Sequence, residues 1–500
     1  MDALDVETSL AAGEPALQAL LQCARAQAGK LAAHEAEQRL FTRRRPMGLA
    51  AMQWSVAERG TGDVGPAITR ADGTRLPRET PLRARKDGAR FGTFAVARTG
   101  YRPAGPPGLC PLEAQVNRPA RCDASCLQAW LTVCAVAPPC QERAGVFAQR
   151  FALEVAERVL MDVATEAPED DDGCSAQRPG PPEDRAGALL VVRVDGQGVP
   201  MIKEAAVQRT AKVGPGAQRQ QKQDALVGVR DTVEATPRSP AALAARLVAP
   251  AAARARRPRA DTRDEAPRAQ QIRRLARVGR TKPAVMAGIK AAVERREPQH
   301  RNPVVIRLDG ARCVWHLATQ RCNAWRRRTL VRDIRPVVGA LWSAANAWCG
   351  DGSPAGTRWV QAKLAAIVRG RGGDVIGSRR QSLTKRQLRK AGRETRATVL
   401  TGFQNHRRWR PDEVDLAAGL PVGTGVVASA CGAVVKPRRE GEGKRWSLTG
   451  AEAMLALRSL QKSHDHDLRD SWRFRARQVR ARLYRRQPNY RPILRMKQVA

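Results

Sequence analysis

Three aspartates follow short apolar runs, and this placement could support metal-dependent chemistry. They are Asp195 after residues 188–194, Asp309 after residues 304–308, and Asp333 at the end of the weaker run 329–333. Such runs are typical of buried strands, and carboxylates at the ends of adjacent strands can share Mg²⁺ ions. Two such ions clamp the attacking and leaving oxygens of a phosphodiester displacement. Asp-Gly after a strand is also ordinary turn chemistry, so both interpretations stay open here.

The 500-residue chain carries a large positive charge that indicates a polyanionic partner. Lys and Arg number 88 against 48 Asp and Glu, which gives a formal net charge of +40 at pH 7. This surplus repels itself unless a polyanion neutralises it, and nucleic acid is the densest polyanion in a cell. The balance argues against a typical metabolic enzyme. Biased codon usage would also enrich Arg and Ala, and composition alone does not separate the two explanations.

Three stretches combine arginines with nearby aromatic side chains, a composition suited to phosphate contact and base stacking. The arginines are Arg326, Arg327 and Arg328, then Arg407, Arg408 and Arg410, and finally Arg473, Arg475 and Arg477. Charged runs are usually solvated surfaces. Three of them on an already basic chain nevertheless favour DNA contact, and such binding should weaken as salt rises.

The order of apolar, acidic and Pro-rich stretches predicts an α/β protein of several parts. Acidic residues 166–173 and a Pro-rich stretch at 179–182 have the composition of a linker. We expect a helical and turn-rich region over 1–92, an accessory DNA-binding domain over 93–180, a core over 181–470 and a basic C-terminal tail over 471–500. Within the core, 236–300 is predicted to be a basic insertion and 340–400 a helical one.

Two helices are predicted in some detail. Residues 14–40 carry spaced leucines and favour an amphipathic helix opened by Pro15. Residues 449–462 favour a second helix, because Thr449 and Glu452 have the spacing of a capping box.

The segment types also bear on location. Residues 1–5 lack the basic and apolar regions of an export signal, and no apolar stretch approaches the ~20 residues that span a bilayer. We therefore expect an intracellular, cytoplasmic protein with no membrane partner, associated with the bacterial nucleoid through its DNA. The eleven cysteines are odd in number and irregularly spaced, which favours reduced thiols.

Four blocks of sequence closely resemble the insertion-sequence transposases of the ISKra group. They are residues 194–204, 308–311, 419–427 and 444–454, in this order, and the resemblance extends from about residue 93 to residue 490. It implies an RNase H-like core, a mixed sheet flanked by helices, with helical insertions and a mostly helical N-terminal region. It also implies an acidic triad that binds two Mg²⁺ or Mn²⁺ ions and cuts and rejoins DNA at the ends of a mobile element.

Carried over by position, the resemblance assigns Asp195 as the first acid and metal ligand and Asp309 as the acid of the second strand motif. Asp333 falls where the family has an Asp followed three positions later by His, but here that later residue is Pro336. Either Asp309 or Asp333 could be the second ligand. We favour Asp309, because its Asp-Gly setting matches that of Asp195.

The third acid departs from the family. The Gly-Thr-Gly-Val-Val segment 423–427 should be followed by Glu, and Ala428 stands there instead. A methyl group cannot ligate a metal, and loss of one catalytic group commonly costs about 10²–10⁴ in rate. Two interpretations follow. One is a transposase acting as a multimer on terminal inverted repeats and target DNA, and the other is a catalytically inactive basic protein that only binds nucleic acid.

Overall fold

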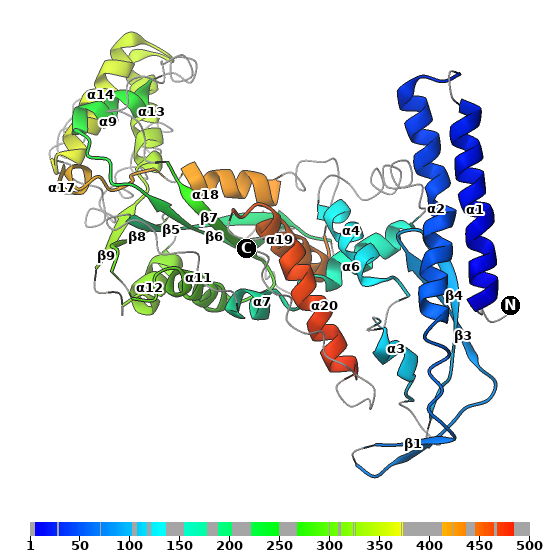
Figure 1. Ribbon diagram of the computed structural model, residues 1–500. Helices are drawn as coiled ribbons and strands as arrows, with labels where there is room; N and C mark the ends of the chain where they lie inside the picture. Colours follow the sequence, from blue (N-terminus) through cyan, green and yellow to red (C-terminus); the bar gives the residue numbers. More distant parts are fainter. Residues whose placement is uncertain are drawn as a thin grey trace. The chain divides into compact units, whose positions relative to one another are not determined.

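The computed structural model shows a mixed α/β protein made of two compact units (Figure 1). The first unit combines Met1–Cys174 with Leu468–Ala500, and the second is Ser175–Asp467. The structure describes residues 6–27, 30–70, 72–102, 108–116, 118, 122–136, 155–177, 189–202, 222–249, 268–299, 301–308, 312–323, 325, 327–371, 373, 413–423, 425–436, 446–464 and 468–484. Within these ranges, each helix is too short or too polar to cross a bilayer.

A five-stranded mixed sheet forms the centre of the second unit. Its order is β7-β6-β5-β8-β9. The strands are β5 (Leu189–Pro200), β6 (Lys222–Val233), β7 (Gln270–Arg277), β8 (Val304–Leu308) and β9 (Arg328–Arg332). β5, β6 and β7 pair antiparallel, whereas β8 runs parallel to β5 and β9 runs parallel to β8. The apolar runs that predicted strands at β5, β8 and β9 are therefore confirmed as strands.

Helices cover both faces of this sheet. On one face, α11 (Lys282–Arg296) and α12 (Arg312–Arg321) pack on alternate apolar residues of β5 and β8. On the other, α18 (Gly425–Ala430), the π-helix η3 (Cys431–Val435) and α19 (Leu448–Gln461) pack on β6 and β7. The period of two along the strands separates these two layers.

A cluster of helices forms a further core of the second unit. It contains α9 (Pro240–Val248), α13 (Arg335–Cys349), α14 (Pro354–Val368) and α17 (Glu413–Ala417). Leu243, Leu341, Leu364 and Leu416 are buried in it. The described part of the predicted helical insertion 340–400 is thus mainly helical, and residues 374–400 lie outside the described residues.

The predicted basic insertion 236–300 contributes to the main sheet. Its described part supplies strand β7 and helix α11, both packed in the core of the second unit. Only Ile272, Ala276 and Arg277 are buried on β7, because it is an edge strand. The arginines of this strand therefore hide its apolar pattern in the sequence.

Helix α19 begins differently from the prediction. Its N-cap is Ser447, whose hydroxyl accepts a hydrogen bond from the Gly450 N–H at 3.1 Å. Glu452 does not close a capping box with Thr449. Its Oε2 instead accepts from the N–H groups of Val278 at 2.7 Å and Gly279 at 3.1 Å, and so holds the end of β7 against α19.

The first unit contains two long helices and two hairpins. Helix α1 (Val6–Gln27) packs on α2 (Ala33–Ala57), which packs in turn on strand β4 (Gly92–Arg98) (Figure 1). β4 pairs with β3 (Arg83–Ala89), and β1 (Ala67–Thr69) pairs with β2 (Arg75–Pro77). The single helix predicted over 14–40 is wrong, because two helices share this range and Pro15 lies inside α1.

Both ends of the chain contribute to the first unit. It includes α3 (Pro111–Gln115), α4 (Ser125–Val136), α6 (Glu157–Glu166) and the C-terminal helix α20 (Leu468–Tyr484), and the boundary between the units falls inside α7 (Asp171–Gln177). The acidic residues 166–173, which have the composition of a linker, lie in α6, in α7 and in the turn between them.

Candidate functional site

Asp195 lies inside a strand. β5 continues to Pro200, and Asp195 is the register partner of Val227 on β6. The parallel pairing with β8 stops one residue earlier, at Val194 and Leu308. The turn interpretation of Asp195-Gly196 is therefore wrong, because the antiparallel partner β6 carries this strand onward. Asp195 therefore lies just past the last described pair with β8, at a position where β5 is still paired with β6.

The sheet register aligns the three residues that precede the predicted aspartates in the sequence. Val194, Leu308 and Arg332 are register partners across β5, β8 and β9, and each is followed directly by an aspartate. Asp195 and Asp333 are described, whereas Asp309 lies outside the described residues.

Asp333 is held in a buried ion pair. It is 6% exposed, its Oδ1 lies 3.7 Å from a guanidinium nitrogen of Arg307, and the same oxygen accepts from the Arg335 N–H at 3.1 Å. Arg307 is fully buried on β8, and its pKa is lowered to about 10 by burial, against the charge of Asp333, which raises it. The Asp333 carboxylate is thus committed to an internal contact.

Arg307 also holds the segment that leads into α18. Its guanidinium donates to the carbonyl oxygens of Pro421 and of Val422, the latter at 2.5 Å. Arg238 donates to the Leu420 carbonyl. Gly419 turns the chain at a φ of +74°, where a Cβ would overlap the backbone of Ala235 and Thr236, so glycine is required there.

A second buried arginine is the register partner of Arg307. Arg193 on β5 forms an ion pair with Asp231 on β6, and both side chains are almost completely buried. Burial, and to a smaller extent the charge of Arg307, lower the pKa of Arg193 to about 9. Two ion pairs therefore lie on the same face of the sheet as Asp195, two residues back along β5 and β8.

These buried arginines could have been noticed in the sequence. Arg193 precedes Asp195-Gly196 by two residues, and Arg307 precedes Asp309-Gly310 by two residues. The repeated Arg-x-Asp-Gly pattern inside two apolar runs is the signal, since an arginine within a buried strand needs an internal partner.

Helix α18 and the π-helix η3 lie against Asp195. The Cys431 thiol donates to the Asp195 Oδ2 at 3.8 Å, and Asp195 Oδ1 accepts from the Gly196 N–H at 2.7 Å. Cys431 is buried, and burial, together with the charge of Asp195, raises the pKa of its thiol to about 12. Ala428 is exposed on α18, three residues before Cys431. The position lacking the family's third acid is thus about one helical turn from the residue that contacts Asp195.

The predicted DNA-contacting arginines of the second unit are only partly described. Arg326, Arg407, Arg408 and Arg410 lie outside the described residues. Arg327 is exposed and donates to the Arg301 carbonyl at 3.0 Å. Arg328 donates to the Cys322 carbonyl at 2.7 Å and to the Asn323 side chain at 2.6 Å.

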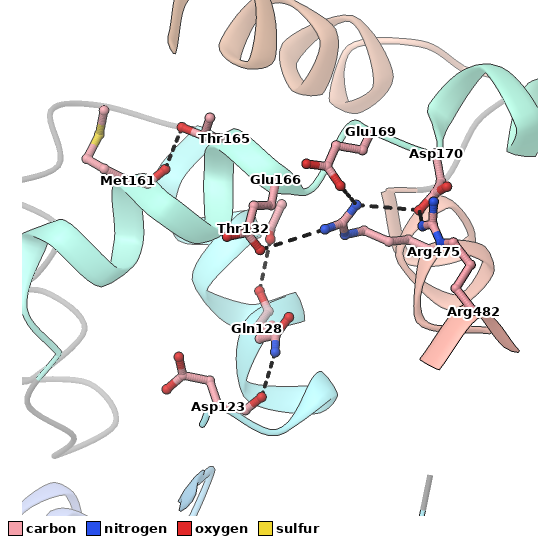
Figure 2. Close-up of polar contacts among 10 residues, drawn as sticks. All are labelled: Asp123, Gln128, Thr132, Met161, Thr165, Glu166, Glu169, Asp170, Arg475 and Arg482. Carbon is pink, nitrogen blue, oxygen red and sulfur yellow. Dashed lines mark hydrogen bonds and ion pairs between the residues drawn. The ribbon is translucent and has the colours of Figure 1, made fainter. Parts of the chain in front are cut away.

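The three predicted arginines of the tail differ in their surroundings. Arg475 is buried, and its guanidinium lies 3.8 Å from Glu166, 3.0 Å from Glu169 and 3.4 Å from Asp170 (Figure 2). Predicted as a DNA contact, Arg475 is instead an internal anchor of α20, because acidic residues at the end of α6 and just after it neutralise its charge. Arg473 and Arg477 are exposed, and Arg477 lies over the Phe474 ring at 6.0 Å.

Within the described part of the chain, no group of three or more His, Cys, Asp or Glu side chains is arranged to hold a metal ion. No family model matches the sequence, and no curated protein matches it.

Proposed function

We propose that the second unit is an RNase H-like catalytic core and that the protein is a DNA transposase of the type resembled by its sequence blocks. The observation that carries this proposal is the sheet register. Val194, Leu308 and Arg332 are partners on three parallel strands, and each precedes an aspartate. Asp195 and Asp333, which are far apart along the chain, therefore follow register partners at the same end of the sheet.

The sheet supports the fold part of the proposal. Three sequential antiparallel strands, followed by two strands parallel to the first, are the arrangement of RNase H-like sheets, and β5 to β9 follow it. A fold is shared by many functions, so the site has to carry the functional argument.

The chemistry of the site suits oxygen-ligated divalent cations. Asp195 and Asp309 would hold Mg²⁺ or Mn²⁺, which prefer carboxylate ligands and complete their shells with water and substrate phosphate. Bound ions would stabilise the charge that develops during phosphodiester hydrolysis and strand transfer. Asp333 is the weaker candidate for the second ligand, because Arg307 already engages its carboxylate.

The chain's own residues would orient the first acid. The Gly196 N–H and the Cys431 thiol each contact one oxygen of Asp195, so the carboxylate has a fixed direction. The guanidinium of Arg307 would fix Pro421 and Val422, which precede α18, against β8.

A second candidate function is favoured by Ala428. Without the third acid, the protein would bind DNA through its positive charge and cut it slowly or not at all. In this alternative, the chain is an inactive nucleic-acid-binding protein that descends from a transposase.

Strand cleavage distinguishes the two candidates. The substrate is a labelled duplex made from the DNA on either side of the gene, where the proposal expects terminal inverted repeats, with Mg²⁺ or Mn²⁺ present. We expect Ala428→Glu to raise cleavage by about 10²-fold or more, since one catalytic carboxylate is commonly worth that much. Ser429→Glu adds the same charge at the exposed neighbouring position and is the matched control.

The controls separate failure of the site from failure of the function. Cleavage by Ala428→Glu should disappear when Asp195→Asn is added. Equal activity of the natural chain, Ala428→Glu and Ser429→Glu would show that our acid assignment is wrong. Salt-sensitive duplex binding without cleavage by any variant would support the inactive binding protein, and a binding affinity that does not change with salt would contradict both candidates.

A further inference from the structure

The helical hairpin of the first unit leaves one side of α1 uncovered by the described residues. α1 and α2 run antiparallel, and a Cβ on Gly13 would lie 3.8 Å from the Cβ of Ala50 (Figure 1). α2 has a second partner, because Leu49, Met52 and Val56 pack on the β3–β4 hairpin. None of the side chains described on α1 is buried.

Four exposed residues form a stripe along α1. They are Glu14, Leu17, Leu21 and Arg25. Their spacings of three, four and four residues place them on one side of a helix. Leu17 is 42% exposed and Leu21 is 45% exposed. Two neighbouring leucines are therefore flanked by an acid at one end and a base at the other.

This stripe is complementary to itself when it is turned end to end. If two copies of α1 pack antiparallel about a two-fold axis near residue 19, Leu17 of one copy lies opposite Leu21 of the other. Nearly the same axis places Glu14 of one copy opposite Arg25 of the other. A two-fold axis creates contacts of this reciprocal kind, in which one residue meets a second and the second meets the first.

We infer that α1 is a homodimer interface, in which the helix packs antiparallel on α1 of a second copy. Leu17 contacts the partner subunit's Leu21, and Glu14 forms an ion pair with the partner subunit's Arg25. Both contacts occur twice, because the axis repeats them. The inference does not depend on the proposed catalytic function.

The stripe fits a second copy better than other partners. It carries one acid and one base, so it has no net charge to attract a DNA backbone. Binding to an unrelated protein would not require the stripe to be complementary to a second copy of itself. The apolar area is small, and the dimer should therefore be weak, with a Kd on the order of micromolar.

Analytical ultracentrifugation of the full chain, freed of nucleic acid and measured from about 1 to 100 µM, tests this interface. Leu17→Ser together with Leu21→Ser should raise the dimer Kd roughly a hundredfold, because four leucines leave the interface. Glu14→Arg and Arg25→Glu should each weaken the dimer, since each places like charges opposite one another twice. Gln22→Arg, at an exposed position off the stripe, is the charge control and should leave the Kd unchanged.

Charge exchange provides the sharpest readout. An equimolar mixture of Glu14→Arg and Arg25→Glu chains should form heterodimers, because every contact then joins opposite charges. The doubly exchanged chain should recover the original Kd. If the single variants dimerised poorly only because α1 had become less stable, neither the mixture nor the doubly exchanged chain would regain dimerisation. Circular dichroism should show the same helix content in all variants.

Three results would overturn the inference. The first is a natural chain that stays monomeric up to 100 µM. The second is a dimer that is insensitive to loss of both leucines, and the third is a mixture of the charge variants that remains monomeric.

Discussion

The ion pair between Arg307 and Asp333 makes a quantitative prediction about the second unit. Arg307→Met removes a fully buried guanidinium and leaves the Asp333 carboxylate, which is only 6% exposed, without this cation. Removing one partner of a buried pair costs about 3–5 kcal/mol. The carbonyls of Pro421 and Val422 also lose a donor, at about 1 kcal/mol each.

One effect works in the opposite direction. Arg307 lowers the pKa of Arg193 by charge repulsion, so removal of Arg307 stabilises the charged form of Arg193. We therefore expect Arg307→Met to lower the free energy of unfolding by about 3–5 kcal/mol in total. This is a large fraction of the stability of a typical domain.

Removing both charges together should cost much less. In Arg307→Met combined with Asp333→Leu, no uncompensated charge remains from this pair, and apolar replacement of a buried pair is often close to neutral. The double variant should lie within about 2 kcal/mol of the natural chain, with the remaining loss due to the two carbonyls. The single variant should therefore be less stable than the double variant.

Urea unfolding of the full chain, followed by tryptophan fluorescence, measures these differences. Trp315 and Trp325 are buried in the same core as β8 and report on the second unit. Hydrogen exchange of the β8 amides gives an independent value for the same strand. A loss below about 1 kcal/mol for Arg307→Met, or a double variant as unstable as the sum of the single ones, would refute the reasoning.

Three other contacts give predictions. Burial raises the pKa of the Cys322 thiol from 9.0 to about 11, so the free energy of unfolding should fall as the pH rises through this window, by about 1.4 kcal/mol at pH 10. In thermal melts at several pH values, the melting temperature of Cys322→Ala should depend less on pH than that of the natural chain. Arg475→Met should detach α20 and speed its proteolysis by roughly tenfold or more, whereas Arg473→Met, at an exposed position, should not. Glu452→Ala should lower the free energy of unfolding by about 1–3 kcal/mol, measured by urea titration, because the Val278 N–H loses its acceptor.

The sequence predicted strands where apolar residues dominate the run and missed a strand where charged residues are adjacent. β5 and β8 were predicted although each contains one buried arginine, Arg193 or Arg307, because apolar residues surround it. β6 was not, since Arg230 and Asp231 interrupt its pattern although both are buried. In the sequence, a buried charged residue with an internal ion-pair partner cannot be told from a surface residue. The partner of Asp231 is Arg193, which lies 38 residues away along the chain.

The candidate site shows the same limit. The run before Asp195 predicted a strand and a carboxylate, but not that β6 would carry the strand past that residue. The contacts of Arg307 with Pro421 and Val422 span 114 and 115 residues, and no local pattern encodes them. The contact between Asp195 and Cys431 spans 236 residues and could be found only once the helix had been placed on the sheet.

The return of α20 to the first unit has a consequence for synthesis. Residues up to Cys174 leave the ribosome first, but their last structural partner begins at Leu468. At about 5–20 residues per second, the intervening segment takes roughly 15–60 s to translate. During that interval, Glu169 and its acidic neighbours lack their cationic partner Arg475, which has not yet been synthesised. A nascent chain halted before α20 would contain every residue of the second unit, whereas the first unit would still lack its C-terminal helix.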